Sequence, residues 1–528
     1  MSLTAFLSGA AVMVAEISAA RAIAPHVGTS IVVWTNVIGI ILVALALGYW
    51  IGGRIAERSV DPVSEFEISN LSAKGGSASG GKFSASHARG ERLLGGIIAV
   101  AGALLIIPAF ATAAIAGSLT EVLLQTGSGF LALLLGSFLL VVILFAFPIF
   151  LLGMVSPFLV KLASSGRTDT GAIAGRLYAI STVGSLVGTF LPTLILFPTI
   201  GTRRTILSAA AVLVVLGCLL LRRRAAIALA LLPLALLVVP ERPPSWFFGG
   251  RVVAAAESRY QYLRIIDAED GERLLAFNEG LGVQSVAVDG DRIPDGYFTV
   301  TAALLALIER DPVRILILGN AGSTIGSIMQ RLFPDRSLAI TGVELDPAVT
   351  AITAAHFPPP LRPYPIIHAD SRAFVRGARE RYDVIVVDAY TNQLTIPAHL
   401  ATREFSALLR DRLAPGGIVV ANVNAPSEDS RLFRTIVQTI ADVFPHVAEG
   451  PAGAWNRLIV ASDRTVDVER LRAASLPASL LDPNGDLRDF LRFVRPVARD
   501  RAIRIFTDDW APLELMTDIE VFAALRHR

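Results

Sequence analysis

The chain contains few charged residues, and the shortage lies mainly in its first 240 residues. Charged residues make up 17% of the 528-residue sequence, whereas ordinary soluble domains have about a quarter. The formal net charge of +2 is too small to indicate a nucleic-acid-binding protein. With 53% hydrophobic residues, the composition indicates instead that a large part of the chain lies in a lipid bilayer.

Cysteine is almost absent, since Cys218 is the single one. One cysteine excludes an intrachain disulfide and any metal site built from a cysteine cluster. Cys218 lies within an apolar run, where we expect a small residue that faces lipid or a packed helix. The first apolar run has no basic segment before it and is followed by further runs, so we find no cleavable-signal pattern.

Six apolar runs are long enough to cross about 30 Å of hydrocarbon, which takes about 20 helical residues. They are Leu3–Ile23, Ile31–Ile55, Leu93–Ala116, Phe130–Leu162, Leu177–Phe197 and Thr205–Leu221. The fourth is over-long and contains Pro148 and Pro157, so we predict a kinked helix that extends beyond the bilayer. A seventh run, Ala225–Val239, has only about 15 residues and is marginal as a span.

Lysine and arginine near the ends of the runs predict the orientation. They concentrate in the second, fourth and sixth connections: Arg58, Lys74, Lys82, Arg89 and Arg92; Lys161, Arg167 and Arg176; Arg222, Arg223 and Arg224. These connections and the N-terminus are therefore predicted inside. If the seventh run lies in the interface, or if the N-terminus is outside and all seven runs cross, the C-terminal domain is cytosolic. We predict a multi-pass cell-membrane protein with that arrangement.

Residues 1–240 are thus a predicted transmembrane helical domain with six or seven spans. Residues 241–292 follow as a proline-rich linker and a small β subdomain. Its predicted strands are Val252–Glu257, Tyr260–Asp267, Glu272–Asn278 and Gln284–Val288, separated by Asp-Gly and Glu-Gly turns. Four short strands are too few to stand alone, so we expect them to pack against the third domain, residues 293–528.

From Arg314 onward, strand and helix patterns alternate. Strands are predicted at Arg314–Leu318, Leu338–Glu344, Ile366–Ala369, Val384–Val387 and Ile418–Val423, and helices at Ser323–Leu332, Pro347–His356 and Thr402–Leu413. Strands this rich in valine and isoleucine are buried on both faces of a sheet. The alternation predicts a Rossmann-like α/β fold with a doubly wound sheet, which binds its ligand at the carboxyl ends of the strands.

The first two strand ends carry groups suited to a nucleoside. Gly319 and Gly322 flank the first turn, where glycine lets the backbone approach a ligand, although a purely structural turn is an alternative. Their Gly-x-x-Gly spacing, with no following Gly-Lys-Ser/Thr, disfavours a dinucleotide or a nucleoside triphosphate. Glu344 ends the second strand and can accept hydrogen bonds from two ribose hydroxyls. Asp346 is either part of this site or a helix N-cap.

The next two strand ends carry further carboxylates. Asp370 is placed to accept from an adenine amino group, with Ser371 as a nearby donor, and its alternative role is again that of a helix cap. Asp388 ends the fourth strand and is aimed at the reaction centre, with Tyr390 beside it. Polar groups at four consecutive strand ends favour one shared nucleoside pocket over four independent caps.

Residues from about 250 to 515 resemble the aminopropyltransferases, the spermidine synthase family. The similar segments occur in family order: Glu257-Ser-Arg-Tyr-Gln, Asn278-Glu-Gly-Leu-Gly-Val-Gln-Ser, Gly319-Asn-Ala-Gly-Ser-Thr, Val343-Glu-Leu-Asp, His368-Ala-Asp-Ser, Val387-Asp-Ala-Tyr, Leu413-Ala-Pro-Gly-Gly-Ile and Thr507-Asp-Asp-Trp-Ala-Pro. The first 240 residues are similar to the helical domain of membrane-fused members, with Gly48-Tyr-Trp-Ile-Gly-Gly and Leu152-Gly-Met-Val-Ser-Pro. The resemblance implies a sheet of the class I methyltransferase type.

The resemblance also implies a reaction, in which decarboxylated S-adenosylmethionine gives its aminopropyl group to putrescine or a related amine. Asp388 and Tyr390 would be catalytic. The nucleoside would be held by Gln261, Gly319, Gly322, Glu344, Asp346, Asp370 and Ser371, and the amine by Gln284, Tyr297, Asp508 and Asp509. The adenosyl compound is a co-substrate, and neither a further cofactor nor a metal ion is implied. A homodimer is expected from the resemblance alone.

The amine side departs from the family pattern more than the nucleoside side. Ala321 stands where the family has an acidic residue, Thr391 replaces the second carboxylate of an Asp-x-x-Asp motif, and Tyr297-Phe-Thr replaces Tyr-His-Glu. The amine is therefore either held differently or is not putrescine. Two alternatives stay open: a methyltransferase-like enzyme that uses S-adenosylmethionine, and a non-catalytic membrane module that senses or transports polyamines.

Overall fold

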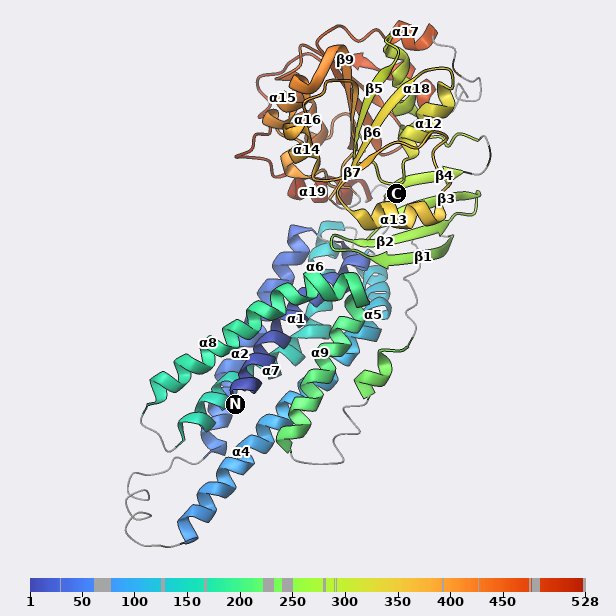
Figure 1. Cartoon of the computed structure of the whole chain (residues 1–528). Coiled ribbons are helices and arrows are strands. Elements are labelled where there is room, and N and C mark those ends of the chain that lie inside the picture. The colour runs from blue at the N-terminus through green and yellow to red at the C-terminus, as the bar shows by residue number, and fades with distance from the viewer. Residues whose placement is uncertain are drawn as a thin grey trace. The chain divides into compact units, whose positions relative to one another are not determined.

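The chain forms two compact units, which we describe separately from a computed structural model (Figure 1). One unit comprises Met1–Gly127 and Leu131–Pro244, and the other comprises Ser128–Phe130 and Ser245–Arg528. The structure describes residues 1–28, 30–60, 77–124, 129–165, 169–221, 232–239, 250–278, 282–288, 290, 292–391, 394–425, 427–473, 476 and 485–525.

The first unit is helical, and its elements are α1 (Ser2–Val27), α2 (Ile31–Ser59), α4 (Ser77–Leu104), α5 (Ile106–Leu124), α6 (Gly129–Val141), α7 (Phe147–Ser164), α8 (Thr170–Leu191) and α9 (Phe197–Leu221). Five helical stretches are long and apolar enough to cross a membrane, and the last of them runs from Thr170 to Leu221. This stretch contains the fifth and sixth predicted runs, which Gly201 separates with φ of +81°. Residues 225–231 of the predicted seventh run lie outside the described residues.

Two short π-helical segments interrupt the apolar helices. Segment η1 (Val142–Ala146) precedes α7, and η2 (Pro192–Leu196) precedes α9. Each ends directly before a Phe-Pro pair, Phe147-Pro148 or Phe197-Pro198. Proline has no N–H and its ring clashes with the carbonyl four residues earlier, so the hydrogen-bond ladder widens there. The distortion in the fourth predicted run therefore lies upstream of Pro148.

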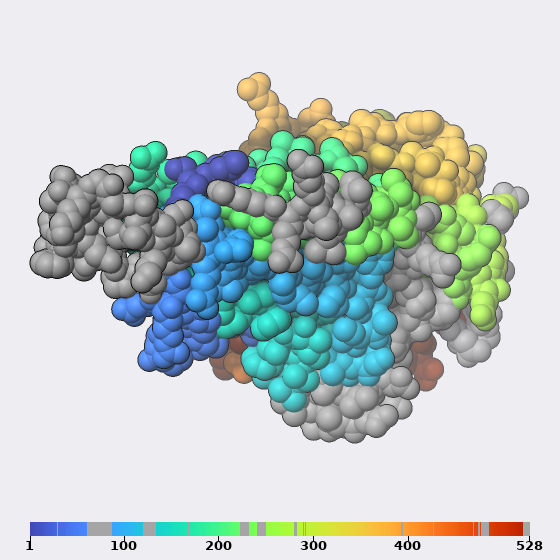
Figure 2. All heavy atoms as spheres, turned by 90° about the horizontal axis from the view of Figure 1, so that it is seen from below, coloured from blue at the N-terminus to red at the C-terminus, as the bar shows by residue number. Residues whose placement is uncertain are grey.

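Glycines let three pairs of these helices approach until their backbones touch. The pairs are α1 with α8, α2 with α7, and α4 with α9. A Cβ atom built on Gly184 would lie 2.1 Å from the carbonyl oxygen of Phe6, and one on Gly48 would lie 2.3 Å from that of Phe150. On Gly217 it would lie 2.5 Å from the oxygen of Gly95. Figure 2 shows the blue, cyan and green segments of this unit in contact on its surface.

The second unit begins with an antiparallel four-stranded sheet in the order β1-β2-β3-β4. Its strands are β1 (Arg251–Glu257), β2 (Tyr262–Asp267), β3 (Glu272–Phe277) and β4 (Val283–Val288). All four predicted strands are confirmed within two residues at each end. One face of this sheet packs on α13 (Pro347–His356) through the cluster that contains Leu263, Phe277 and Val349. The predicted packing against the following domain is therefore confirmed.

The larger sheet has eight strands in the order β12-β10-β11-β9-β8-β5-β6-β7. They are β5 (Val313–Leu318), β6 (Leu338–Glu344), β7 (Ile366–His368), β8 (Tyr382–Val387), β9 (Leu413–Asn424), β10 (His446–Pro451), β11 (Asn456–Ser462) and β12 (Arg495–Pro496). Strands β5 to β9 are parallel, whereas β10, β11 and β12 pair antiparallel. This is the predicted doubly wound sheet of the class I methyltransferase type, and its strand order reverses beside β5.

Helices cover both faces of this sheet, as Figure 1 shows. They are α11 (Tyr297–Ala303), α12 (Thr324–Leu332), α13, α14 (Ser371–Gly377), α15 (Arg403–Arg412), α16 (Arg431–Ala441), α17 (Val468–Ala473), α18 (Asp486–Phe493) and α19 (Leu513–Leu525), with 3-10 turns η3 (Leu304–Leu307) and η4 (Ala398–Leu400). Two apolar clusters pack between the sheet and its helices. Helices α11, α12 and α18 contribute to one cluster, and α15 and α16 contribute to the other. Because β5 to β8 are parallel neighbours, their carboxyl ends meet at one edge of the sheet.

Candidate functional site

The turn after β5 is held in an unusual backbone conformation. Gly319 has φ of +87°, and a Cβ atom there would lie 2.2 Å from the carbonyl oxygen of Asp388. Ala321 and Ser323 also have positive φ, at 41° and 66°. The N–H of Gly322 donates to Oγ of Ser285 on β4, at 2.8 Å. Non-glycine residues with positive φ are strained and concentrate at binding sites, so this turn is a candidate wall of the pocket.

Glu344 joins this turn to the end of β6. Its Oε2 accepts from the N–H of Ala321 at 2.9 Å, and its Oε1 accepts from the N–H of Asp346 at 3.0 Å. Burial raises the pKa of Glu344 and outweighs these two hydrogen bonds, which lower it. Each carboxylate oxygen has a second acceptor site. Glu344 can therefore still receive the two ribose hydroxyls for which the sequence predicts it.

Asp346 and Asp370 both cap helices, as their alternative roles predict. Asp346 accepts from the N–H of Ala348 at 3.0 Å, and Asp370 accepts from the N–H of Ala373 at 2.8 Å. Capping uses one carboxylate oxygen of each residue. The other oxygen of Asp370 accepts from Nε2 of His399 at 2.8 Å. Burial raises the pKa of Asp370, whereas the hydrogen bonds from Ala373 and His399 together lower it by more. The net shift of the pKa is therefore downward.

Asp388 follows β8 directly and is enclosed by uncharged donors. Nδ2 of Asn422, on β9, donates to its Oδ1 at 2.9 Å, and the hydroxyl of Tyr297, on α11, donates to its Oδ2 at 3.1 Å. Burial raises the pKa of Asp388 to about 7, although these two hydrogen bonds lower it. A carboxylate with this pKa can take up and release a proton near neutrality.

Tyr297 and Tyr390 both stand near Asp388 but bond differently. The hydroxyl of Tyr390 donates to the backbone oxygen of Asn422 at 3.0 Å, whereas that of Tyr297 donates to Asp388 itself. Burial and the neighbouring Asp388 raise the pKa of both phenols well above the usual value of 10. Both therefore remain neutral and serve as hydrogen-bonding groups rather than as bases.

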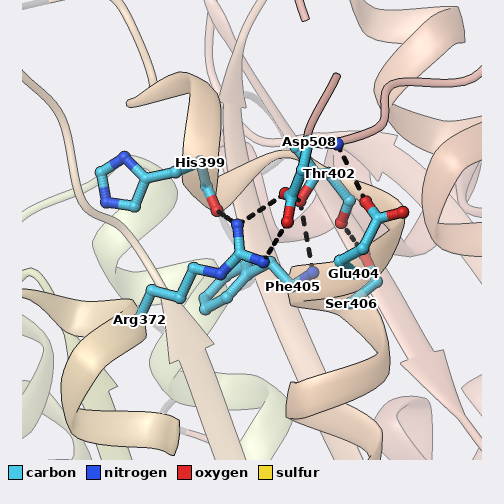
Figure 3. A network of polar contacts seen from close by, with 7 residues as sticks. All are labelled: Arg372, His399, Thr402, Glu404, Phe405, Ser406 and Asp508. Atoms are coloured by element: carbon cyan, nitrogen blue, oxygen red, sulfur yellow. Dashed lines mark hydrogen bonds and ion pairs between the residues drawn. The ribbon is translucent and has the colours of Figure 1, made fainter. Parts of the chain in front are cut away.

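Asp508 belongs to a polar network at the other end of the site (Figure 3). Arg372 follows Ser371 at the start of α14. It donates to both carboxylate oxygens of Asp508 at 2.6 Å and to the backbone oxygen of His399 at 3.1 Å. Thr402, the N-cap of α15, donates to Asp508 at 2.8 Å. The structure thus joins Asp508 to the Asp370 side of the site. The contact between Asp508 and the amine, which the resemblance implies, stays a prediction.

The remaining predicted residues lie at separate positions. Gln261 is buried before β2, and its Oε1 has no hydrogen-bond partner among the described residues. Ser371 is buried at the first position of α14, and Gln284 is half-buried on β4. Asp509 is exposed in the turn between Thr507 and Trp510.

Four residues at the site were not predicted from the sequence: Ser285, Arg372, His399 and Asn422. Asn422 precedes the last residue of the predicted strand Ile418–Val423, so the pattern places it inside the strand, whereas in the structure it donates to Asp388. The rule that polar groups at strand ends form the site applies to it as well. The other three act through contacts between distant segments, for which a single sequence carries no signal.

Comparison with known proteins agrees with this geometry. A family model described as the spermine/spermidine synthase domain matches residues 307–451. The synthase-domain match thus lies within the C-terminal unit and covers part of it. The matched segment runs from η3 to the last residue of β10, and so includes the strand ends that carry Glu344, Asp370 and Asp388.

About half of this chain is similar to known proteins. The probable polyamine aminopropyl transferase of Bifidobacterium longum is 31% identical over 278 residues, which cover 49% of this chain and 61% of the relative. The polyamine aminopropyltransferase of Vibrio vulnificus is 27% identical over 279 residues, covering 50% and 91%. A solved probable spermidine synthase from Corynebacterium glutamicum has 20% identity and a TM-score of 0.40, covering 50% and 99%.

Proposed function

We propose that the chain is a membrane-bound polyamine aminopropyltransferase, which uses decarboxylated S-adenosylmethionine to alkylate putrescine or a related amine. The observation that carries this proposal is the buried Asp388, which accepts from Asn422 and Tyr297 and lies at the same sheet edge as Glu344. The synthase-domain match over residues 307–451 supports the reaction class.

The proposed chemistry requires one proton acceptor and one well-placed leaving group. An alkylamine titrates near about 10 and is protonated at neutral pH. Asp388 accepts a proton from the ammonium, and the freed nitrogen attacks the aminopropyl carbon bonded to the sulfonium. The C–N bond forms as the C–S bond breaks, and the electron pair stays on sulfur. The products are the alkylated amine, the neutral thioether methylthioadenosine, and a proton that passes from Asp388 to solvent.

The nucleoside is proposed to lie across the strand ends that Glu344 and Asp370 mark. Glu344 accepts from the ribose hydroxyls, and Asp370 and Ser371 face the base. Gln261, whose buried Oε1 has no partner in the described part of the chain, supplies a further acceptor. Gly319 and Gly322 give the backbone room beside the sugar, and Asp346 supports this wall by capping α13.

The amine is proposed to enter beside Tyr297, whose hydroxyl already reaches Asp388. Gln284, Asp508 and Asp509 are candidate contacts for its far end. The neutral Ala321 and Thr391 leave this side with less negative charge than a diamine would favour. A panel of acceptors that includes monoamines as well as putrescine will therefore identify the substrate better than putrescine alone.

The helical unit is proposed to anchor the enzyme in the cell membrane as a multi-pass domain, with the catalytic unit in the cytosol. Its five long apolar stretches support this. After expression, the chain is expected in the membrane fraction and to resist extraction by alkaline carbonate. Recovery in the soluble fraction contradicts the anchor. A homodimer, also proposed, predicts twice the chain mass by light scattering in detergent.

The decisive experiment incubates the purified full chain with an amine and either decarboxylated or intact S-adenosylmethionine, followed by mass spectrometry. Methylthioadenosine together with the alkylated amine supports the proposal. S-adenosylhomocysteine identifies a methyltransferase instead. If neither product forms while the nucleoside binds, the enzymatic proposal is wrong and a sensing role takes its place.

A further inference from the structure

A row of three asparagine side chains leads from Asp388 across the neighbouring strands. Asn422 and Asn424 lie two positions apart on β9, so both project from the same face of the sheet. Asn456, the first residue of β11, stands opposite Asn424 in the antiparallel register. Its Nδ2 donates to Oδ1 of Asn422 and to Oδ1 of Asn424, each at 3.0 Å.

The direction of the Asn422 amide decides what Asp388 faces. An asparagine amide has a donor end and an acceptor end, and a half-turn about χ2 exchanges them. With its N–H toward Asp388, the amide stabilises the ionised carboxylate. With its oxygen toward Asp388, two acceptors would face each other and the ionised form would be disfavoured. The contact with Asp388 alone does not prevent this exchange when the carboxyl is protonated.

We propose that Asn456 is a positioning residue that fixes the Asn422 amide with its N–H toward Asp388. Nδ2 of Asn456 is a donor only, so it pairs with the oxygen end of Asn422 and leaves the N–H end for the carboxylate. The hydrogen bonds then run in one direction, from Asn456 through Asn422 to Asp388. Bonds arranged head to tail polarise and strengthen one another.

The surroundings of Asp388 let this effect be measured. In the described part of the chain, the titratable groups that face Asp388 are Tyr297 on α11 and Tyr390 in the segment after β8. Both phenols stay neutral, and Asn422 on β9 and Asn456 on β11 carry no charge. A substitution at Asn456 therefore changes the direction of one amide without adding or removing a charge. The inference rests on the proposed function in so far as it assigns Asp388 as the base.

The test compares the pH dependence of kcat/KM in the full-length wild type and in Asn456→Leu. The Leu side chain has a similar size and no donor. We expect the acidic limb of the profile to move to higher pH by about one unit, because the Asn422 amide can then turn its oxygen toward the protonated carboxyl and stabilise that form. Asn456→Ser keeps a hydroxyl donor and is expected to lie between the two. Asn424→Ala is the matched control, because it removes the other acceptor of Asn456. The acidic limb of the Asn424→Ala profile is expected to coincide with that of the wild type.

A limb that stays in place in Asn456→Leu, while turnover falls equally at every pH, would overturn the proposal and leave a purely structural role. A second readout does not depend on turnover. Infrared difference spectroscopy without substrates follows the protonated-carboxyl band of Asp388, which is identified by its loss in Asp388→Asn. We expect this band to persist to higher pH in Asn456→Leu. If the wild type turns over no amine, the proposed function fails, whereas this titration still decides the role of Asn456.

Discussion

At the scale of single residues, the two central carboxylates of the site are enclosed in different ways. Glu344 accepts from two backbone N–H groups, whereas Asp388 accepts from two side chains. Backbone donors are fixed by the fold, which suits a group that binds. Side-chain donors can be exchanged by substitution, so the proton affinity of Asp388 is open to adjustment.

Asp388→Asn is expected to abolish turnover, because an amide cannot accept the ammonium proton at neutral pH. Nucleoside binding should remain close to the wild-type value, since the proposed nucleoside contacts lie elsewhere. Turnover by mass spectrometry and affinity by calorimetric titration separate the two effects. Wild-type turnover in the variant would exclude Asp388 as the base.

The same substitution is expected to stabilise the fold in alkaline solution. Asp388 has a pKa of about 7 in the folded chain, against about 3.9 when unfolded. The folded state therefore retains a proton that the unfolded state releases, and stability from this group is lost as the pH rises from about 4 to about 7. At about pH 8, Asp388→Asn should gain roughly 2–4 kcal/mol in free energy of unfolding, and at about pH 4 almost nothing. Denaturant titrations at both pH values test this, and equal gains would contradict it.

Glu344→Ala is expected to weaken nucleoside binding by roughly 1–3 kcal/mol, because ribose hydroxyls would lose their acceptor. Calorimetric titration with methylthioadenosine measures the loss. Glu344→Gln is the matched variant, since it keeps the size and one acceptor oxygen. Unchanged affinity in Glu344→Ala would remove Glu344 from the nucleoside site.

At the scale of elements, the sequence predicted the parallel core closely. The strand Leu338–Glu344 and the helix Pro347–His356 have the same bounds in the structure. Their β-branched runs and the Asp346-Pro347 start are local signals. Strand β9 begins at Leu413, five positions before the predicted Ile418, because Leu413 pairs with Tyr382 of β8 ahead of an irregularity that contains the Ala-Pro-Gly-Gly segment.

Elements after residue 424 were not predicted, and their placement depends on contacts that a single sequence does not show. Strand β11 lies between β9 and β10, and β12 is a two-residue strand that pairs with β10. The same limit applies to the site. Asp388 and Glu344 follow from strand ends, whereas the bond between Arg372 and Asp508 joins residues 136 positions apart.

The Arg372–Asp508 pair gives a prediction at this scale, because it ties α14 to the turn before α19 and to the N-cap of α15. Arg372→Ala and Asp508→Ala are each expected to lower stability. A double-mutant cycle should yield a coupling of about 1 kcal/mol, above that of an exposed pair, because the bond is bidentate and Arg372 is mostly buried. The cycle is measured by denaturant titration. Additive losses would mean that the two residues act independently.

At the scale of the whole molecule, the two units use different means of cohesion. The C-terminal unit has two large apolar clusters on either side of a sheet. In the helical unit, glycines bring paired backbones into direct contact, as is typical of helices packed in lipid, where close approach of small residues replaces the hydrophobic effect. The α1–α8 pair is the clearest case, because Gly184 and Gly188 meet the carbonyl oxygens of Phe6 and Ala10.

Gly184→Leu is therefore expected to separate α8 from α1 and to destabilise the helical unit by about 3 kcal/mol or more, at the upper end of overpacking costs. Gly175→Leu is the matched control in the same helix, because a Cβ atom built there meets no atom within 4 Å. Thermal aggregation of both variants in detergent provides the measurement. Equal midpoints would show that the contact at Gly184 adds no stability.

The backbone contacts along these helix pairs also restrict where a small molecule can move through the helical unit. Since carbonyl oxygens already touch glycine Cα positions between α1 and α8, and between α2 and α7, no hydrated cation fits between those helices. A permeation route, if the unit has one, must follow a different boundary. Crosslinks that lock these pairs together should consequently leave any flux unaltered.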